Sequence, residues 1–234
     1  MQGLYLVTPN WDDTARLLAA SEEALDAGAA AKKDDGGGKG GGNFVALLQY
    51  RHKEAGPDLR RAQAAALLAL CRRYGVPFIV NDFVDLCLEI GADGVHLGGT
   101  DADVAQVRGR LGADKIIGAS CYGDMPRALA AQRDGASYVA FGGFYPSRVK
   151  QYAVTTRPEI LDQARGAIRV PTVVIGGMTA ANAAPLVARG ADMVAAISSV
   201  YQAASVRDAV GEFAPLFVVH NNSKSFGRAG LSAL

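Results

Sequence analysis

The chain has 234 residues, half of them hydrophobic, and a formal net charge of +1 at pH 7. This balance argues against a broad electrostatic surface for nucleic acid or an anionic membrane, so we expect neither partner and expect any anion site to be local. The beginning of the chain lacks signal-peptide features, no apolar run reaches the ~18 residues of a membrane span, and the three cysteines form no CxxC pair, which predicts a reduced, cytoplasmic protein.

Short apolar or β-branched runs recur along the chain, each followed by a longer Ala- and Leu-rich stretch. Eight such runs predict strands, at residues 4–8, 44–49, 78–81, 94–97, 116–119, 138–141, 172–175 and 193–197. Segments such as 58–73 and 179–189 have helical spacing and predict outer helices. This alternation predicts an α/β fold, a single-domain (β/α)8 TIM barrel over residues 1–216, since such barrels commonly reach this length.

Two segments depart from the alternation. Residues 32–42 are rich in Gly and Lys and bury too little apolar surface to offset their ordering entropy, so we expect a flexible insertion between the first helix and the second strand. Residues 217–234 form a tail without periodicity, to which the sequence assigns no role. The oligomeric state is not encoded in a recognisable pattern, which leaves a homo-oligomer open.

The second predicted strand ends in an amide and two cations. In a (β/α)8 barrel the functional residues lie at the carboxyl ends of the strands, because those ends converge on one rim. Gln49, Arg51 and Lys53 share one face of an extended segment at such an end. They suit a diphosphate, since Arg offers a planar fork of donors and Lys a mobile point charge. The alternative is a solvated basic surface.

The third and fourth predicted strands carry the candidate metal ligands. Asn81 and Asp82 end the third strand, and Asp101 follows the fourth. Carboxylates from adjacent strand ends can share Mg²⁺, with waters and phosphate oxygens completing its octahedron. Each aspartate would otherwise form an Asx-turn or cap a helix. His96, within the fourth strand, is more typical of a packed, hydrogen-bonded histidine than of a zinc ligand.

Ser120 and Cys121 follow the fifth predicted strand. The sequence offers no adjacent base to activate either one, so we interpret Ser120 as a hydrogen-bond donor and Cys121 as structural. A turn-rich loop with Ser147 and Lys150 follows the sixth strand. Its glycines would let backbone N–H groups approach an anion, and the loop could swing Arg148 or Lys150 over the barrel mouth as a lid. An inert, exposed lysine is the alternative.

The seventh and eighth predicted strands end in a candidate phosphate site. Gly176 and Gly177 follow the seventh strand, and Ser198 and Ser199 follow the eighth. In phosphate-using barrels the phosphate commonly binds between the loops after these two strands, where backbone amides approach it. A Gly-Gly pair alone is a weak signal, but its position beside two serines predicts a phosphate site.

Taken in chain order, these motifs resemble the signature of the thiamine phosphate synthase family. They are Gln49-x-Arg51-x-Lys53, Asn81-Asp82, His96-Leu97-Gly98 with Asp101, Ser120, Pro146-Ser147 with Lys150, Ile175-Gly176-Gly177 and Ile197-Ser198. The resemblance implies a transferase that uses Mg²⁺ to join hydroxymethylpyrimidine diphosphate to hydroxyethylthiazole phosphate. The carbon–oxygen bond to diphosphate would break first, and the thiazole nitrogen would attack the resulting pyrimidine methylene cation.

The resemblance also implies a role for each residue of the motifs. The diphosphate would be held by Arg51, Lys53, Asn81 and Lys150, and Mg²⁺ by Asp82 and Asp101. Gln49, His96 and Ser120 would face the pyrimidine or the departing oxygens, and Gly177 and Ser198 would face the thiazole phosphate. Gly176 and Ser199 are expected to contact substrate beside them. Ser147 would also contact substrate, and the residues expected to assist catalysis are Arg51, Lys53, Ser120 and Lys150.

The chain departs from the family pattern at four positions. The family usually has an acidic residue at His52, a basic or polar residue at Phe83, a Gln at Gly99 and a Thr at Val149. The last change replaces a hydroxyl expected beside the diphosphate with a methyl group, which leaves a lowered or absent activity open.

Two other functions therefore stay open. One is a thiazole tautomerase of the same superfamily, although such proteins tend to lack the diphosphate cations and metal aspartates that this chain has. The other is a non-catalytic protein that binds a phosphate ligand.

Overall fold

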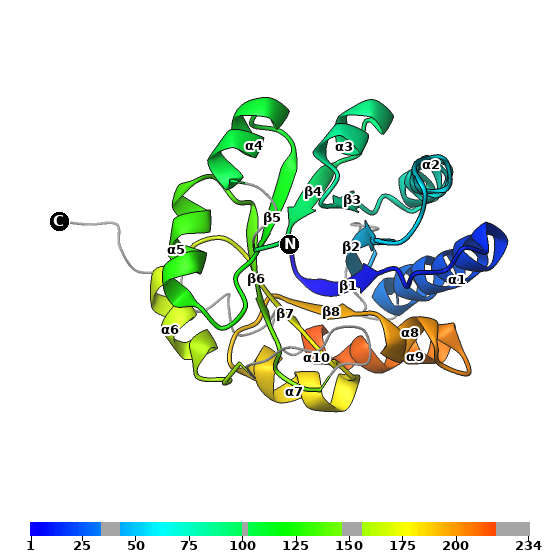
Figure 1. Cartoon of the computed structure of the whole chain (residues 1–234). Coiled ribbons are helices and arrows are strands. Elements are labelled where there is room, and N and C mark those ends of the chain that lie inside the picture. The colour runs from blue at the N-terminus through cyan, green and yellow to red at the C-terminus, as the bar shows by residue number, and fades with distance from the viewer. Residues whose placement is uncertain (34–42, 100–102, 147–155, 219–234) are drawn as a thin grey trace, which may run out of the picture.

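Eight parallel strands close into a barrel that is surrounded by helices (Figure 1). The computed structural model describes residues 1–33, 43–99, 103–146 and 156–218. The strands pair in chain order, and β8 closes the sheet against β1. Each predicted strand is confirmed to within one residue at either end; the strands are β1 Gly3–Val7, β2 Val45–Tyr50, β3 Phe78–Asn81, β4 Gly94–Leu97, β5 Ile116–Ser120, β6 Tyr138–Gly142, β7 Thr172–Ile175 and β8 Met193–Ala196.

Helices connect successive strands and cover the outside of the barrel. They are α1 Thr14–Lys33, α2 Pro57–Tyr74, α3 Val84–Ile90, α4 Val104–Leu111, α5 Met125–Arg133, α6 Ile160–Ala167, α7 Ala180–Ala188, α8 Ser198–Tyr201, α9 Val206–Phe213 and α10 Pro215–Val218. The helices predicted at 58–73 and 179–189 are confirmed as α2 and α7. Over the residues described, none of these helices is long and apolar enough to cross a bilayer.

Two boundaries differ from the expectation drawn from sequence. Helix α1 continues through Lys33, because its alanine-rich end runs into two lysines and lysine is a good helix former. The expected insertion at 32–42 therefore overlaps α1, and residues 34–42 lie outside the described ranges. At the other end, α10 passes residue 216, and the ring of Phe217 packs 5.6 Å from that of Phe44 between their centroids. The first residues of the expected tail thus belong to the packed structure.

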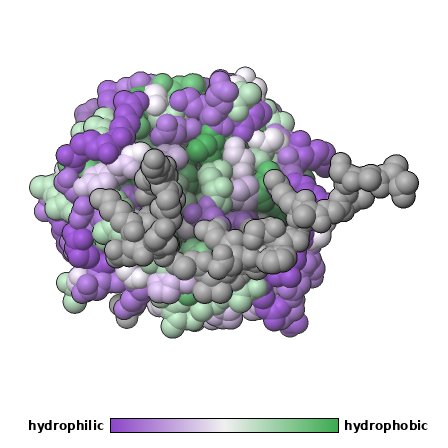
Figure 2. All heavy atoms as spheres, turned by 180° about the vertical axis from the view of Figure 1, so that it is seen from behind, coloured by the Kyte–Doolittle hydropathy of each residue, from purple (hydrophilic) through white to green (hydrophobic). Residues whose placement is uncertain are grey.

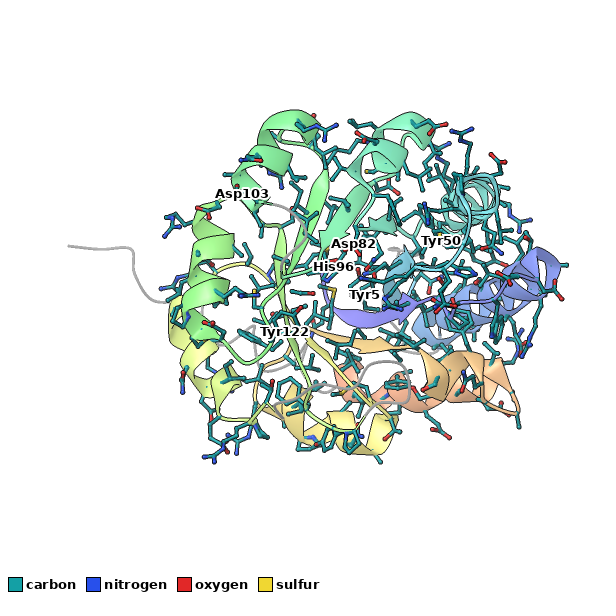
Figure 3. The ribbon with its side chains drawn as sticks, in the orientation of Figure 1. Tyr5, Tyr50, Asp82, His96, Asp103 and Tyr122 are labelled. Atoms are coloured by element: carbon teal, nitrogen blue, oxygen red, sulfur yellow. The ribbon has the colours of Figure 1, made fainter. Side chains whose placement is uncertain are left out.

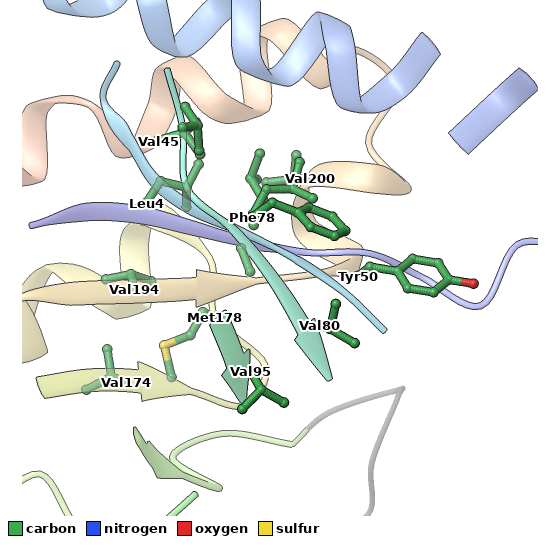
Figure 4. Packing of buried hydrophobic residues seen from close by; sticks show 14 of the residues in the cluster. Leu4, Val45, Tyr50, Phe78, Val80, Val95, Val174, Met178, Val194 and Val200 are labelled. Atoms are coloured by element: carbon green, nitrogen blue, oxygen red, sulfur yellow. The ribbon is translucent and has the colours of Figure 1, made fainter. Parts of the chain in front are cut away.

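The alternation of side chains along the strands creates two apolar cores. Tyr5 and Val7 of β1 point into the barrel and pack there with Leu47, Ile79, Tyr138, Ala140, Val173, Met193 and Ala195. Leu4 and Leu6 belong to the larger core between the barrel and the helices. Figure 4 shows part of this outer core, with Leu4, Val45, Val80, Val174 and Val194 on neighbouring strands. Apolar residues on both faces explain why these strands appear as almost unbroken hydrophobic runs.

Gly118 of β5 leaves room for the phenol of Tyr138 inside the barrel. Tyr138 is fully buried, and a Cβ atom at Gly118 would overlap both its ring and its hydroxyl. Space, rather than an unusual backbone conformation, therefore requires glycine at this position.

We expect Gly118→Ala to lower the free energy of unfolding by about 1–3 kcal/mol, the usual range for an overpacked core, in urea unfolding followed by circular dichroism. The matched control is Gly109→Ala at an exposed position of helix α4, where a new Cβ has no neighbour within 4 Å. It should raise that free energy by up to about 1 kcal/mol, because alanine is the better helix former. A Gly118→Ala protein as stable as its parent would contradict the packing argument.

Candidate active site

A cavity of about 350 Å³ lies at the carboxyl ends of the strands. Residues within or just after all eight strands contribute to its wall. Apolar side chains such as Val7, Val173 and Ala195 line it together with polar residues that follow the strands. Figure 2 shows a hollow near the middle of the face seen from behind, where hydrophobic and hydrophilic residues meet. The cavity thus combines an apolar wall with polar groups that can bind anions.

Gln49, Arg51 and Lys53 all line this cavity. The backbone of Arg51 is held by Thr8, a fully buried residue just after β1 whose Oγ1 accepts a hydrogen bond from the Arg51 N–H at 2.8 Å. The end of β2 is therefore fixed to the end of β1, and the two cations project from an ordered backbone.

His52, between the two cations, is buried and is not part of the cavity wall. Its Nε2 lies 2.9 Å from Oδ1 of Asp12, and its Nδ1 accepts a hydrogen bond from the Ala55 N–H at 3.1 Å. The residue that departs from the family's acidic position therefore anchors the loop after β2.

Asp82 has a left-handed backbone conformation, with φ 62°, just after β3. Its N–H donates to the carbonyl of His96 at 2.9 Å, and its Oδ1 accepts from the Gly98 N–H at 3.2 Å, so its position is tied to β4. Its Oδ2 accepts from the amide of Asn81 at 2.6 Å and lies 3.1 Å from Nζ of Lys53. The carboxylate thus lies at the cavity with one cation already beside it, and Asn81 and His96 line the same space.

A chain of hydrogen bonds links five side chains across the barrel interior. Nε2 of Gln49 donates to the Tyr5 hydroxyl at 2.5 Å, and this oxygen lies 2.6 Å from that of Tyr138. The Tyr138 oxygen lies 3.0 Å from Nδ1 of His96, whose Nε2 lies 2.9 Å from Oγ of Ser120. Figure 3 shows Tyr5 and His96 in the middle of the barrel, near Asp82. Three predicted site residues, Gln49, His96 and Ser120, are therefore joined through two tyrosines.

Tyr5, Tyr138 and Tyr122 are not among the site residues expected from the sequence. Burial raises the pKa of Tyr5 and of Tyr138 above the ordinary value for a phenol, so both hydroxyls stay protonated. Tyr5 and Tyr138 are polar side chains within otherwise apolar strands. This pattern could have indicated a hydrogen-bonding role, because a buried phenol normally finds a hydrogen-bond partner. Tyr122 follows β5, lines the cavity and has a positive φ of 51°, which nothing in the local sequence signals.

The loops after β7 and β8 form another part of the wall. Gly176, Gly177 and Ser198 line the cavity. Gly177 has φ 62°, and a Cβ there would overlap the carbonyl oxygen of Pro146, so this close approach of two loops requires glycine. Ser199 does not line the cavity, and its buried Oγ has no hydrogen-bond partner among the described residues. Of the two predicted serines, Ser198 therefore lines the cavity and Ser199 does not.

Space beside Gly99 is already filled. A Cβ at this position would overlap Tyr122 and Arg127, and Nη1 of Arg127 donates to the Gly99 carbonyl at 3.1 Å. These two side chains occupy the region into which the glutamine usual in the family would extend.

Several predicted residues lie outside the described ranges, namely Asp101, Ser147, Val149 and Lys150. Within those ranges no group of three or more His, Cys, Asp or Glu residues is placed to hold a metal ion. Asp82 is therefore the one member of the predicted metal pair whose surroundings are described.

Known proteins resemble this chain over most of its length. The family model for thiamine monophosphate synthase matches residues 4–200. A thiamine-phosphate synthase of Janthinobacterium sp. (strain Marseille) is 58% identical over 217 residues, which cover 93% of this chain and 97% of the relative. One from Thiobacillus denitrificans is 47% identical over 215 residues, covering 92% and 94% of the two chains. The solved thiamine phosphate pyrophosphorylase of Pyrococcus furiosus has a TM-score of 0.74 at 30% identity and covers 94% of this chain and 96% of its own.

The cysteines should be unreactive in the folded protein. Burial raises the pKa of Cys87 to about 11 and that of Cys71 and Cys121 to about 12. At pH 8 we expect a thiol reagent such as Ellman's reagent to label the native protein at least about 100-fold more slowly than the unfolded protein, because the thiolate fraction falls tenfold per unit of pKa. Fast labelling of Cys121, identified by peptide mapping, would contradict its interpretation as a structural residue.

Proposed function

Because the chain belongs to the thiamine monophosphate synthase family, we propose that it is a thiamine phosphate synthase, a transferase that acts on small-molecule substrates. It joins the methylene carbon of hydroxymethylpyrimidine diphosphate to the ring nitrogen of hydroxyethylthiazole phosphate and releases pyrophosphate. The observation that carries the proposal is that Arg51 and Lys53 line the same cavity as Gly177 and Ser198. The reaction needs one site that accepts two phosphate-bearing substrates.

Arg51, Lys53 and Asn81 hold the diphosphate in this proposal. Arg51 supplies paired donors, Lys53 a mobile charge and Asn81 an amide, and each of them lines the cavity. Negative charge grows on the diphosphate as its carbon–oxygen bond breaks, so these cations stabilise the transition state more than the bound substrate. Lys150 stays a proposed fourth ligand.

The carboxylate of Asp82 suits Mg²⁺, because it is a hard oxygen donor whose orientation is held by the Gly98 N–H and by Asn81. We assign the ion to Asp82 together with Asp101. When bound, the ion supplies positive charge beside the departing diphosphate. Nζ of Lys53 lies 3.1 Å from Oδ2 of Asp82, and in this proposal Lys53 turns from the carboxylate to the diphosphate when the ion binds.

The remaining wall protects and orients the pyrimidine. Departure of diphosphate leaves a pyrimidine methylene cation, which the electron-donating amino group of the ring stabilises and water would destroy. Apolar side chains such as Val7, Ala140 and Val173 exclude water from this part of the cavity. Gln49 and Ser120 orient the ring through hydrogen bonds, and the thiazole phosphate is held by the backbone at Gly176 and Gly177 and by the hydroxyl of Ser198.

The proposal is tested by incubating the purified protein with both substrates and Mg²⁺ and measuring pyrophosphate together with thiamine phosphate. A thiazole tautomerase would isomerise the thiazole phosphate without releasing pyrophosphate. A non-catalytic protein would bind the thiazole phosphate and form no product. Either result would overturn the proposed function.

We expect Asp82→Asn to lower kcat by about 100-fold, a typical loss when a group that acts on transition-state charge is removed. The dissociation constant for thiazole phosphate, measured by calorimetry, should change by less than about twofold, since Asp82 acts on the other substrate. Asp85→Asn is the matched control, because the Asp85 side chain is exposed in α3 and pairs with Arg110 at the surface. An unchanged kcat for Asp82→Asn would refute the role of Asp82.

Ser198→Ala should raise the KM for thiazole phosphate by about tenfold, because the variant loses one hydrogen bond to a charged group. The kcat at saturating substrate should be nearly unchanged. The control is Ser199→Ala, the same change at a residue that does not line the cavity. Steady-state kinetics with thiazole phosphate as the varied substrate provide the measurement. Equal effects of the two changes would contradict the assignment of Ser198.

A further inference from the structure

The hydrogen-bonded chain from Gln49 to Ser120 has a definite direction. Each of its two phenols has a single hydrogen to donate, and both phenols are fully buried. Tyr5 accepts from the amide of Gln49, so its own hydrogen is available to the oxygen of Tyr138, 2.6 Å away. The hydrogen of Tyr138 then points to Nδ1 of His96, which must be the unprotonated nitrogen of the ring.

The other ring nitrogen of His96 completes the sequence. With Nδ1 accepting, the neutral ring carries its hydrogen on Nε2 and donates it to Oγ of Ser120 at 2.9 Å. A ring protonated on both nitrogens would turn the hydrogen of Tyr138 back toward Tyr5. The hydrogens of Tyr5 and of the Gln49 amide would then point at each other, which would leave a buried donor without an acceptor and destabilise the fold.

We propose that Tyr5 and Tyr138 are positioning residues that hold His96 in its Nε2–H tautomer and thereby direct the hydroxyl hydrogen of Ser120 into the cavity. Neither tyrosine needs to touch the reacting atoms for this role. Each acts through the next member of the chain, and the last member lines the cavity.

The direction of the chain determines which ligand groups the wall can accept. The amide of Gln49 turns its nitrogen to Tyr5, which leaves its oxygen as an acceptor for the ligand, while Ser120 offers a donor. An aminopyrimidine carries the complementary groups, an amino donor and a ring-nitrogen acceptor. This step rests on the proposed function, whereas the tautomer of His96 does not.

The first experiment measures the tautomer directly. Nitrogen-15 NMR of the ligand-free protein labelled at histidine reports which ring nitrogen carries hydrogen. The chain has only three histidines, His52, His96 and His220, and single His→Gln substitutions assign their signals. We expect His96 to be protonated at Nε2. A native ring protonated at Nδ1 would overturn the proposal, because the chain would then run from Ser120 toward Gln49.

The second experiment breaks the chain. In Tyr138→Phe the donor to Nδ1 is lost, and we expect the Nδ1–H tautomer of His96 to become populated. Tyr5→Phe should also populate the Nδ1–H tautomer of His96, but to a smaller extent. Tyr138 keeps its hydroxyl hydrogen in this variant, but it no longer accepts the hydrogen bond from Tyr5 that turns this hydrogen toward His96. His52 is the internal control, since its Nδ1 accepts from the Ala55 N–H in a separate cluster. A His96 tautomer that is unchanged in both variants would overturn the proposal.

Kinetics separate this inference from the proposed function. If the protein releases pyrophosphate, Tyr138→Phe should raise the KM for the pyrimidine diphosphate several-fold while leaving the KM for thiazole phosphate unchanged. A general loss of structure would raise both values, and an unchanged KM for the pyrimidine diphosphate would refute the link to recognition. If His96 is protonated at Nε2 but the protein releases no pyrophosphate, the proposed tautomer is confirmed and the proposed function is refuted.

Discussion

The backbone hydrogen bonds that close β8 against β1 are the constraint on which the site depends. The helical crossovers make the strands parallel, and closure then brings all of their carboxyl ends together at one rim. Residues that are distant in sequence, such as Lys53 and Asp82, come within 3.1 Å only because their strands are neighbours in this barrel. The same closure leaves no exposed sheet edge and gives each strand two covered faces, one toward the barrel interior and one toward the helices.

Among the described residues, Gln49, Tyr5, Tyr138, His96 and Ser120 form a continuous hydrogen-bonded set within the largely apolar barrel interior. A buried hydroxyl without a partner destabilises a fold, and these groups avoid that loss by bonding to one another. Glycine at position 118 supplies the room that Tyr138 needs to reach His96. Packing and polarity are therefore coupled here, because a change in the size of one residue displaces a member of the hydrogen-bonded chain.

The rim has the opposite character, because its charged groups are held near water. Lys53 is about half exposed, and an exposed ion pair contributes only about 0–1 kcal/mol. Its pairing with Asp82 therefore offsets the charge of that carboxylate without holding the Lys53 side chain firmly. In the proposed function, a diphosphate would draw Lys53 away and leave the carboxylate to the metal ion at little loss of stability. Other contacts fix the site, since the Thr8 hydroxyl holds the backbone of Arg51 and the Gly98 N–H holds the carboxylate of Asp82.

The sequence by itself determined the strands, and with them the positions of Gln49, Arg51 and Ser198 at the rim. Local periodicity decides which residues form a strand, and a parallel barrel leaves only one end for a site. The helix that continues to Lys33 escaped prediction because composition suggested a loop. The tertiary structure alone decided that Tyr5 meets Tyr138, 133 residues away, and that Ser199 does not share the cavity with Ser198. Such contacts depend on which residues face one another across the interior of the closed barrel, and no local sequence pattern specifies those pairs.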